Sequence, residues 1–167
     1  MRGLHPELCA WLSAAAATLA ALEQGAARAV SGAARGPDSG PELREALAAA
    51  SWVSQRLRQE LEDRVAELFG AVTPQPEAPI DGLAALAGTA VALQGAWEDA
   101  LPRVDAHTRL LLRLQLAQWE AVVVPALVAT CGTAGDMSAC RMALADRLPP
   151  PPDHPEAFLA SVGLPEP

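Results

Sequence analysis

Apolar residues recur every three or four positions along four long segments of the chain, which is the spacing of a helix that buries one face. In the first segment, leucine and alanine alternate at heptad spacing: Leu8, Leu12, Ala15, Leu19, Leu22, Ala26 and Ala29. Pro6 and Glu7 suit the first turn of this helix, since proline loses no hydrogen bond there and a carboxylate complements the helix dipole. Residues 31–40 are rich in glycine, proline and serine, which predicts a loop.

The second segment has the clearest division between an apolar and a polar face. The apolar positions are Leu43, Leu47, Ala50, Val53, Leu57, Leu61, Val65 and Leu68. The opposite face carries Arg44, Glu45, Gln55, Arg58, Glu62 and Asp63. We predict an amphipathic helix that begins at Pro41 and ends at Gly70, followed by a stiff proline-containing crossover to a helix cap at Asp81.

The third segment predicts a helix from about Gly82 to Leu101, which Pro102 ends. The inward positions are Leu83, Leu86, Ala90, Leu93 and Trp97. Gly88 and Gly95 share one face of this helix. Because an interior glycine costs ~1 kcal/mol relative to alanine, we expect a close contact with another helix to offset that cost.

The fourth segment is apolar on most of its circumference. Its apolar residues are Leu110, Leu111, Leu112, Leu114, Leu116, Trp119, Val122, Val123 and Val124. Asp105 is the expected cap, and Pro125 predicts a kink because it cannot donate to the carbonyl of Ala121. Such a helix has to be covered on most sides, so it either lies centrally beneath the C-terminal segment or supplies a dimer interface.

The chain changes character after Gly132. Asp136 is expected to cap a short fifth helix, and the prolines at 149–152 predict a polyproline spacer. The tail beyond the spacer carries four apolar residues that we expect to bind a partner, either this bundle or another chain: Phe158, Leu159, Val162 and Leu164. The predicted fold is therefore all-α, an antiparallel four-helix bundle at 1–148 with a short fifth helix, followed by a proline-linked docking segment at 149–167.

One tryptophan falls in each long segment, at Trp11, Trp52, Trp97 and Trp119. A tryptophan at a seam position packs into the core more often than it lines a ligand pocket, and both interpretations stay open at this point. Trp52 and Trp97 are the expected exposed pair because each has polar neighbours in the sequence.

The charge and the cysteines limit the classes of partner. The formal net charge is −8 and the 12 cationic residues, all arginine, are scattered, which argues against nucleic acid as a partner. No stretch approaches the ~20 uninterrupted apolar residues of a membrane span. Cys9, Cys131 and Cys140 lack metal-ligand spacing, so we expect reduced thiols in a cytoplasmic protein, with a disulfide between Cys131 and Cys140 as the alternative.

The residue types that carry catalysis are sparse. The serines lie in helical contexts rather than in a nucleophile elbow, and the glycines match no phosphate-binding loop. The histidines, His5, His107 and His154, lie near the ends of predicted segments, and we interpret His107 as a surface residue in a first helical turn. We therefore expect no enzymatic activity, no catalytic residues and no cofactor.

Residues 93–118 (LQGAWEDALPRVDAHTRLLLRLQLAQ) join a third helix with an acidic end to a leucine-rich fourth helix by a short turn. This layout resembles the ferritin-like four-helix-bundle superfamily, over roughly Glu7 to Ala129. The resemblance implies a di-metal site built from glutamates and Glu-x-x-His motifs on the four helices. The candidate ligands are Glu23, Glu98 and Glu120, but no helix contains a Glu-x-x-His motif, so the resemblance implies a fold whose metal site has been lost.

Two functions of different class follow. The first is an acidic, non-catalytic interaction or scaffold protein that binds a protein partner or itself, as an oligomer such as a dimer, through the fourth helix and the C-terminal segment. It binds neither nucleic acid nor membrane. The alternative is a ferritin-like carboxylate metal-binding or oxidative-stress protein.

Overall fold

The computed structural model describes residues 6–33, 41–70, 78–80, 82–131 and 137–149, and every regular element in these ranges is helical. The elements are α1 (Pro6–Ala33), α2 (Pro41–Phe69), α3 (Leu83–Ala100), a 3-10 turn (Leu101–Arg103), α4 (Ala106–Gln118), a π-helical turn (Trp119–Val123), α5 (Val124–Cys131) and α6 (Met137–Arg147). The all-α prediction is therefore confirmed.

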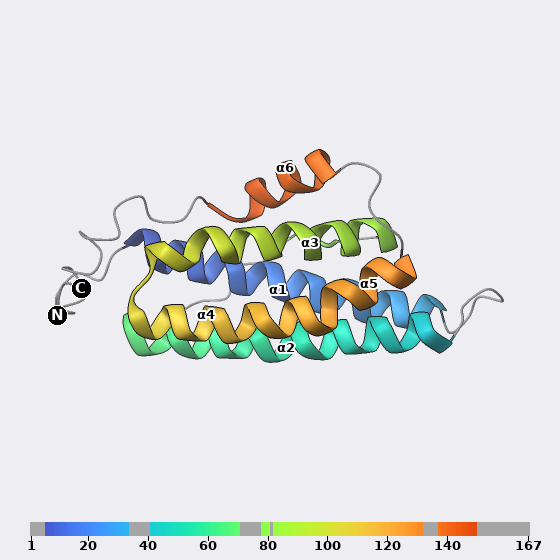
Figure 1. Cartoon of the computed structure of the whole chain (residues 1–167), viewed down its shortest axis with the longest axis horizontal. Helices are drawn as coiled ribbons and strands as arrows, with labels where there is room; N and C mark the ends of the chain where they lie inside the picture. Colours follow the sequence, from blue (N-terminus) through green and yellow to red (C-terminus); the bar gives the residue numbers. More distant parts are fainter. Residues whose placement is uncertain (1–5, 34–40, 71–77, 81, 132–136, 150–167) are drawn as a thin grey trace.

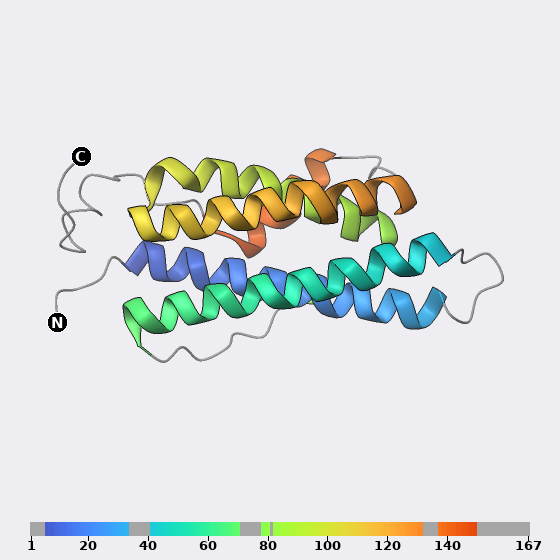
Figure 2. The same ribbon diagram turned by 60° about the horizontal axis from the view of Figure 1, so that its bottom comes forward.

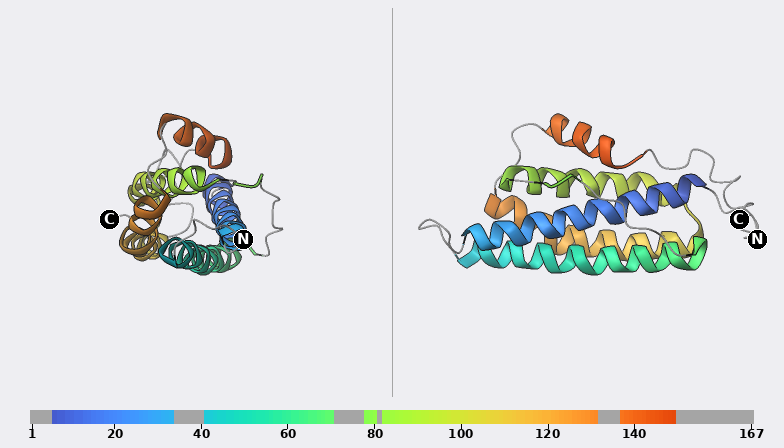
Figure 3. Two further views of the ribbon diagram at one scale, coloured as in Figure 1. Left: turned by 90° about the vertical axis from the view of Figure 1, so that its right-hand side faces the viewer. Right: turned by 180° about the vertical axis from the view of Figure 1, so that it is seen from behind.

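The long helices lie side by side along the long axis of the molecule (Figure 1). The helices α4 and α5 continue one another through the π-helical turn and form a single rod. Figure 2 shows α1 beside α2, and α3 beside the rod of α4 and α5. In the end-on view of Figure 3, these helices surround a common axis and α6 lies outside them, over α3.

The predicted apolar faces of α1 and α2 form a large part of the core. In α1 the buried seam runs through Leu8, Leu12, Ala15, Leu19, Leu22 and Ala26. In α2 the buried positions include Leu47, Ala50, Val53, Leu57, Leu61 and Val65, while Leu43 and Leu68 are partly buried against them. Gly70 ends α2 as predicted, with a φ of 87° that favours glycine.

A close backbone approach occurs at Gly25 in the middle of α1. A Cβ built at this position would lie 2.5 Å from the carbonyl oxygen of Ile80, which belongs to the segment before α3. The side chain of Ile80 is buried, and Arg28 Nη2 donates to the same oxygen over 3.4 Å. Only glycine lets this segment lie directly on α1.

Three predictions for α3 require correction. The N-cap residue is Gly82, with a φ of 97° and no side-chain cap, whereas Asp81 lies outside the described residues. Leu83 is exposed because it sits at the first residue of the helix, beyond the packed turns. The close helix contact expected at Gly95 is wrong, because a Cβ there would meet nothing within 4 Å.

The fourth helix begins where the sequence predicts, and a π-helical turn precedes the proline at which a kink is expected. Asp105 caps α4, since its carboxylate accepts a hydrogen bond from the Thr108 amide over 3.2 Å. One residue before Pro125, the Val124 amide donates to the carbonyl of Trp119, five residues back. The backbone hydrogen bonds thus span five residues instead of four in a π-helical turn, next to the proline that lacks an N–H donor.

The described residues do not cover the fourth helix on most sides, so the first alternative, a central position, is wrong for them, and the dimer interface stays a prediction. Leu110 is 60% exposed, Leu114 63% and Val122 40%. The reason is the position of α6, which packs on α3 and α1 through the buried side chains of Leu144 and Leu148 and leaves the rod of α4 and α5 uncovered on its outer side (Figure 3). Asp136, the expected cap of α6, lies outside the described residues.

We predict opposite effects of alanine at two glycines of α1. Gly25→Ala should lower the free energy of unfolding by about 1–3 kcal/mol, because its methyl group would collide with the Ile80 carbonyl. Gly32→Ala is the matched control: its Cβ would meet nothing within 4 Å, so the better helix propensity should leave stability equal or raised by up to ~1 kcal/mol. Urea denaturation measures both values, and equal effects would contradict the close packing of Ile80 on α1.

Candidate functional site

Glu23, the metal-ligand candidate of α1, forms an ion pair with an arginine of α2. Its carboxylate lies 3.1 Å from Arg58 Nε of α2, and the two side chains are 22% and 21% exposed. Arg58 also donates from Nη1 to Glu62 over 3.1 Å. Burial lowers the pKa of Arg58, but the hydrogen bonds and charges of Glu62 and Glu23 outweigh this effect and raise it above its ordinary value. Glu23 therefore ties α1 to a permanent cation on α2.

The other two candidates, Glu98 and Glu120, meet at the surface around one glutamine. Gln94 Nε2 donates to Glu98 Oε1 over 3.4 Å and to Glu120 Oε1 over 3.1 Å. The structure thus brings together two of the three predicted carboxylates, on α3 and on the π-helical turn, and leaves Glu23 apart. Within the described ranges, no group of three His, Cys, Asp or Glu residues is placed to hold a metal ion.

The remaining sequence candidates are either exposed or not described. His107 is exposed in the first turn of α4, as expected, while His5 and His154 lie outside the described residues. Cys9 and Cys140 are free thiols, and the side chain of Cys131 is not described. The predicted docking residues also lie outside the described residues: Phe158, Leu159, Val162 and Leu164.

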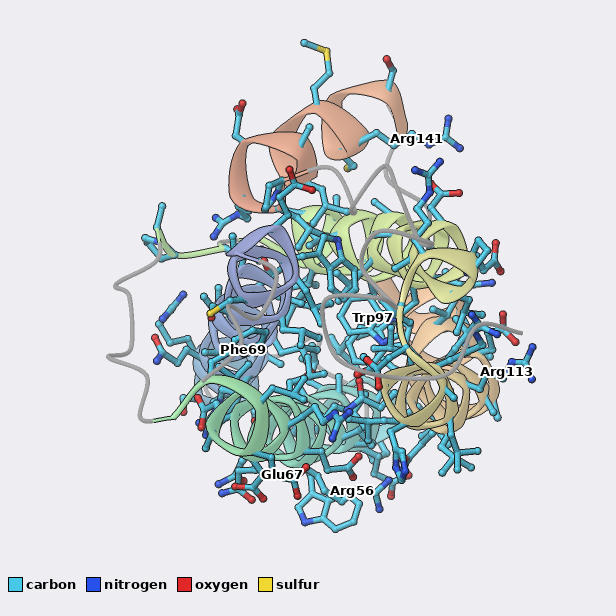
Figure 4. The ribbon with its side chains drawn as sticks, turned by 90° about the vertical axis from the view of Figure 1, so that its left-hand side faces the viewer. Arg56, Glu67, Phe69, Trp97, Arg113 and Arg141 are labelled. Atoms are coloured by element: carbon cyan, nitrogen blue, oxygen red, sulfur yellow. The ribbon has the colours of Figure 1, made fainter. Side chains whose placement is uncertain are left out.

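The tryptophans divide differently from the prediction. Trp52 is 59% exposed, as expected, and stacks against the Arg56 guanidinium at 5.1 Å from its ring centroid. Trp97 is only 4% exposed, so the prediction of an exposed Trp97 is wrong. The acidic neighbours of Trp97 in sequence point to solvent, whereas its own ring lies in the centre of the helices (Figure 4) and contacts Trp11 edge-on at 5.6 Å.

A buried glutamine that the sequence analysis overlooked joins three helices. Trp97 Nε1 donates to Gln115 Oε1 over 3.1 Å, and Gln115 Nε2 donates to the Leu57 carbonyl over 3.2 Å. Gln115 is 1% exposed. A signal was present, since Thr108, Leu112, Gln115, Trp119 and Val123 recur at helical spacing and form the buried face of α4 and the π-helical turn.

A second polar cluster fixes the beginning of α4 to the end of α2. Arg64 Nη2 lies 2.9 Å from Asp105 Oδ2, and Arg64 Nε donates to Thr108 Oγ1 over 3.1 Å. The side chains of Arg64 and Asp105 are 15% and 4% exposed. The arginine therefore neutralises the buried carboxylate.

Both clusters perform the same task. Most of their donors and acceptors are used in contacts between helices, although Asp105 Oδ1 has no hydrogen-bond partner among the described residues, and neither cluster pairs a nucleophile with a general base. They fix where α4 lies along α2 and which of its sides faces the core. Reading the apolar residues alone could not reveal them, because both clusters use polar residues at seam positions.

Among the described residues, exposed apolar side chains gather on the outward side of α4 and the π-helical turn. We call it the outer seam of α4, and it consists of the exposed residues Leu110, Leu114, Ala117, Ala121 and Val122. Leu110, Leu114, Ala117 and Ala121 follow one another at alternating steps of four and three residues, the spacing of a helix-pairing seam. Arg113 and Glu120 border it, both exposed, and Figure 4 shows Arg113 directed away from the interior.

The same helix is the one candidate membrane span in the part of the chain that the structure describes. Ala106–Ala129 is long and apolar enough to cross a membrane, by length and composition alone. Its most apolar 18-residue stretch has a mean hydropathy of 1.3, and 33% of that stretch is buried. Arg109, Arg113 and Glu120 interrupt this helix, and charges inside a bilayer are costly.

Comparison with known proteins gives no match: no family model, no curated protein and no solved structure matches this chain.

We predict that Gln115→Leu lowers the free energy of unfolding by about 1–3 kcal/mol. The indole N–H of Trp97 would lose its acceptor inside the core, and the Leu57 carbonyl would keep only its bond within α2. Gln24→Leu, at an exposed position of α1, is the control and should change stability by less than ~0.5 kcal/mol. Thermal and urea denaturation test both variants, and similar values for the two would show that the amide of Gln115 is dispensable.

We also predict that the chain does not retain a di-metal centre. After expression with excess iron and manganese, elemental analysis of the desalted protein should find far less than one metal ion per chain, because Glu23 lies apart from Glu98 and Glu120. Two metal equivalents per chain that disappear in Glu120→Ala would contradict this prediction.

Proposed function

We propose that this chain is a non-catalytic interaction protein, an antiparallel four-helix bundle that binds a second copy of itself through the outer seam of α4. The packing of α1 along α2, and of the rod of α4 and α5 on α2 and α3, supports the bundle. The free thiols of Cys9 and Cys140 support a cytoplasmic setting. The C-terminal segment with Phe158 is proposed as an additional contact.

The observation that carries this proposal is the exposure of large apolar side chains on a single helix. Leu110 and Leu114 are 60% and 63% exposed and lie one turn apart. Burial of one such side chain contributes about 1.5–3 kcal/mol, so a partner that covers this seam gains a substantial apolar contact. Contiguous exposed apolar surface of this kind is typical of protein interfaces.

The sizes of the side chains suit an antiparallel pairing with a second copy. In a symmetric dimer, each residue contacts the same partner position reciprocally. If Leu110 lies opposite Ala121 of the other copy, then Leu114 lies opposite Ala117, so every layer combines a large side chain with a small one. This alternation lets two helices approach closely and interdigitate.

The charges at the border of the seam suit the same pairing. In this alignment, Arg113 of each copy lies next to Glu120 of the other, which creates two symmetric pairs of opposite charge. In a parallel pairing in register, the charges of the two copies would lie on opposite edges of the interface, so these pairs would not form. Complementary charges at the border of a helix pair set its orientation more than its strength.

The length of the seam sets the expected strength. From Leu110 to Ala121 the helix advances about 17 Å at 1.5 Å per residue. A contact between two helices over this distance is smaller than a standard interface of about 1,600 Å², so we expect a reversible dimer with a dissociation constant in the micromolar range or weaker.

The alternative, a ferritin-like carboxylate metal-binding or oxidative-stress protein, is supported only by the meeting of Glu98 and Glu120 at Gln94. Both glutamates are exposed, and each already accepts a hydrogen bond from Gln94. A ferritin-like relationship is accordingly proposed for the fold alone.

We predict that Leu114→Arg weakens dimerisation by roughly tenfold or more, because it places a charge in a central layer on both copies. Met142→Arg is the matched control, since Met142 is 69% exposed on α6, away from the outer seam. Sedimentation equilibrium over a range of concentrations measures the effect. A monomeric wild-type protein at the highest concentration would overturn the proposal, and flotation of that monomer with anionic vesicles would assign the seam to a membrane instead.

Exchanging the charges of Arg113 and Glu120 tests the orientation of the two copies. Arg113→Glu or Glu120→Arg alone should weaken the dimer by roughly tenfold, because each creates two repulsive contacts. The double variant Arg113→Glu/Glu120→Arg restores both attractive pairs and should dimerise like the wild type. A double variant that is weaker than either single variant would contradict the antiparallel arrangement.

A further inference from the structure

A cavity of about 300 Å³ lies between α6 and the helices beneath it. Its lining comes from three helices and the residue that follows the last of them: Trp11 of α1, Ala92, Gly95, Ala96 and Asp99 of α3, Arg141, Leu144, Ala145 and Leu148 of α6, and Pro149. The volume is at the lower end of the range found for small-molecule sites. It holds about ten non-hydrogen atoms, if each takes the ~30 Å³ share of a water molecule.

One side chain in this lining is a buried hydrogen-bond donor without an acceptor. Trp11 is 0% exposed, and its Nε1 has no hydrogen-bond partner within the described part of the chain. The other two buried tryptophans are satisfied, since Trp97 donates to Gln115 Oε1 and Trp119 donates to the Ala90 carbonyl. An unsatisfied buried donor costs about 1–3 kcal/mol. Since Nε1 has no exposed surface in this structure, an acceptor in the cavity reaches it only when the side chains packed against the indole move aside.

Gly95 is the second observation, and it is independent of the first. This glycine lies inside α3, where it costs ~1 kcal/mol relative to alanine, and no close helix contact explains it. A Cβ at this position would meet nothing within 4 Å, so it would project into free space on the side of the helix that lines the cavity. The missing side chain therefore keeps the cavity open.

The chemistry of the lining defines the ligand. Leucine, alanine and the tryptophan ring surround most of the space, and the charged side chains, Asp99 and Arg141, are exposed. Figure 4 shows Arg141 at the outer edge of α6, far from Trp97 in the interior. An anionic group next to Trp11 would lose its hydration with no buried cation to compensate, whereas a neutral oxygen acceptor needs only one donor.

We propose that this cavity binds a small, uncharged, apolar molecule that carries one oxygen acceptor, such as a ketone or an ester, and that Trp11 Nε1 donates a hydrogen bond to that oxygen. The ligand lies between α6 and α3 and adds apolar contacts between these two helices. This site is independent of the outer seam of α4, which lies on the rod of α4 and α5.

Acetophenone and ethylbenzene are suitable probes, because they are similar in size and shape and only the ketone has an acceptor. In the proton–nitrogen NMR spectrum of the full chain, the indole N–H signal that disappears in Trp11→Phe belongs to Trp11. Acetophenone should shift this signal downfield in a saturable manner. It should also bind roughly three- to tenfold more tightly than ethylbenzene, the gain expected from one buried hydrogen bond.

Two variants test the site itself. Gly95→Val should abolish binding of both probes, because its side chain fills the cavity, and the unchanged dispersion of the remaining signals will show that the fold is intact. Trp11→Phe keeps an aromatic ring but removes the donor, so ethylbenzene should bind as before and acetophenone should lose its advantage. Equal binding of the two probes to the wild type, or undiminished binding to Gly95→Val, would overturn the proposal.

Discussion

The burial of Gln115 determines how α4 is rotated about its own axis. Its amide satisfies the indole N–H of Trp97 on one side and the carbonyl of Leu57 on the other. If α4 turned to bury Leu110 and Leu114, the indole N–H of Trp97 would lose its acceptor in the core, at a cost of about 1–3 kcal/mol, and the Leu57 carbonyl would keep only its bond within α2. The hydrogen bonds of Gln115 thus keep the face of α4 that carries both polar and apolar residues inside, and leave the face with Leu110 and Leu114 outside.

The cluster at Asp105 complements this restraint at the beginning of the same helix. Arg64 binds the capping carboxylate and the Thr108 hydroxyl, so the end of α2 holds the first turn of α4. Two polar attachments at different heights prevent α4 from sliding or turning along α2. Buried polar groups fix a single arrangement of packed elements in some proteins, and here the observed arrangement places the outer seam of α4 in solvent.

Two glycines have opposite consequences for packing. At Gly25 the missing Cβ lets the Ile80 backbone lie on α1, and the space is filled. At Gly95 the missing Cβ leaves space between α3 and α6, and that space belongs to the cavity lined by Trp11. Both residues lie inside long helices, so their sequence environments give no indication of which glycine closes a contact and which one keeps it open.

Local signals in the sequence determined the helices and the core faces of the first two. Pro6 and Pro41 begin helices, Gly70 ends one and Asp105 caps another, because each acts on backbone groups within a few residues of itself. The leucine and alanine seams of α1 and α2 could also be identified, since on each of these helices a single face is apolar.

Only the tertiary structure decided the features on which the candidate sites depend. These are the burial of Trp97, the outward direction of Leu110 and Leu114, and the open space at Gly95. On α4 two sides compete for the core, and the outcome rests on a glutamine whose partners, Leu57 and Trp97, lie on other helices. The physical reason is that a polar group is satisfied only by its neighbours in space, and these are not its neighbours in the sequence.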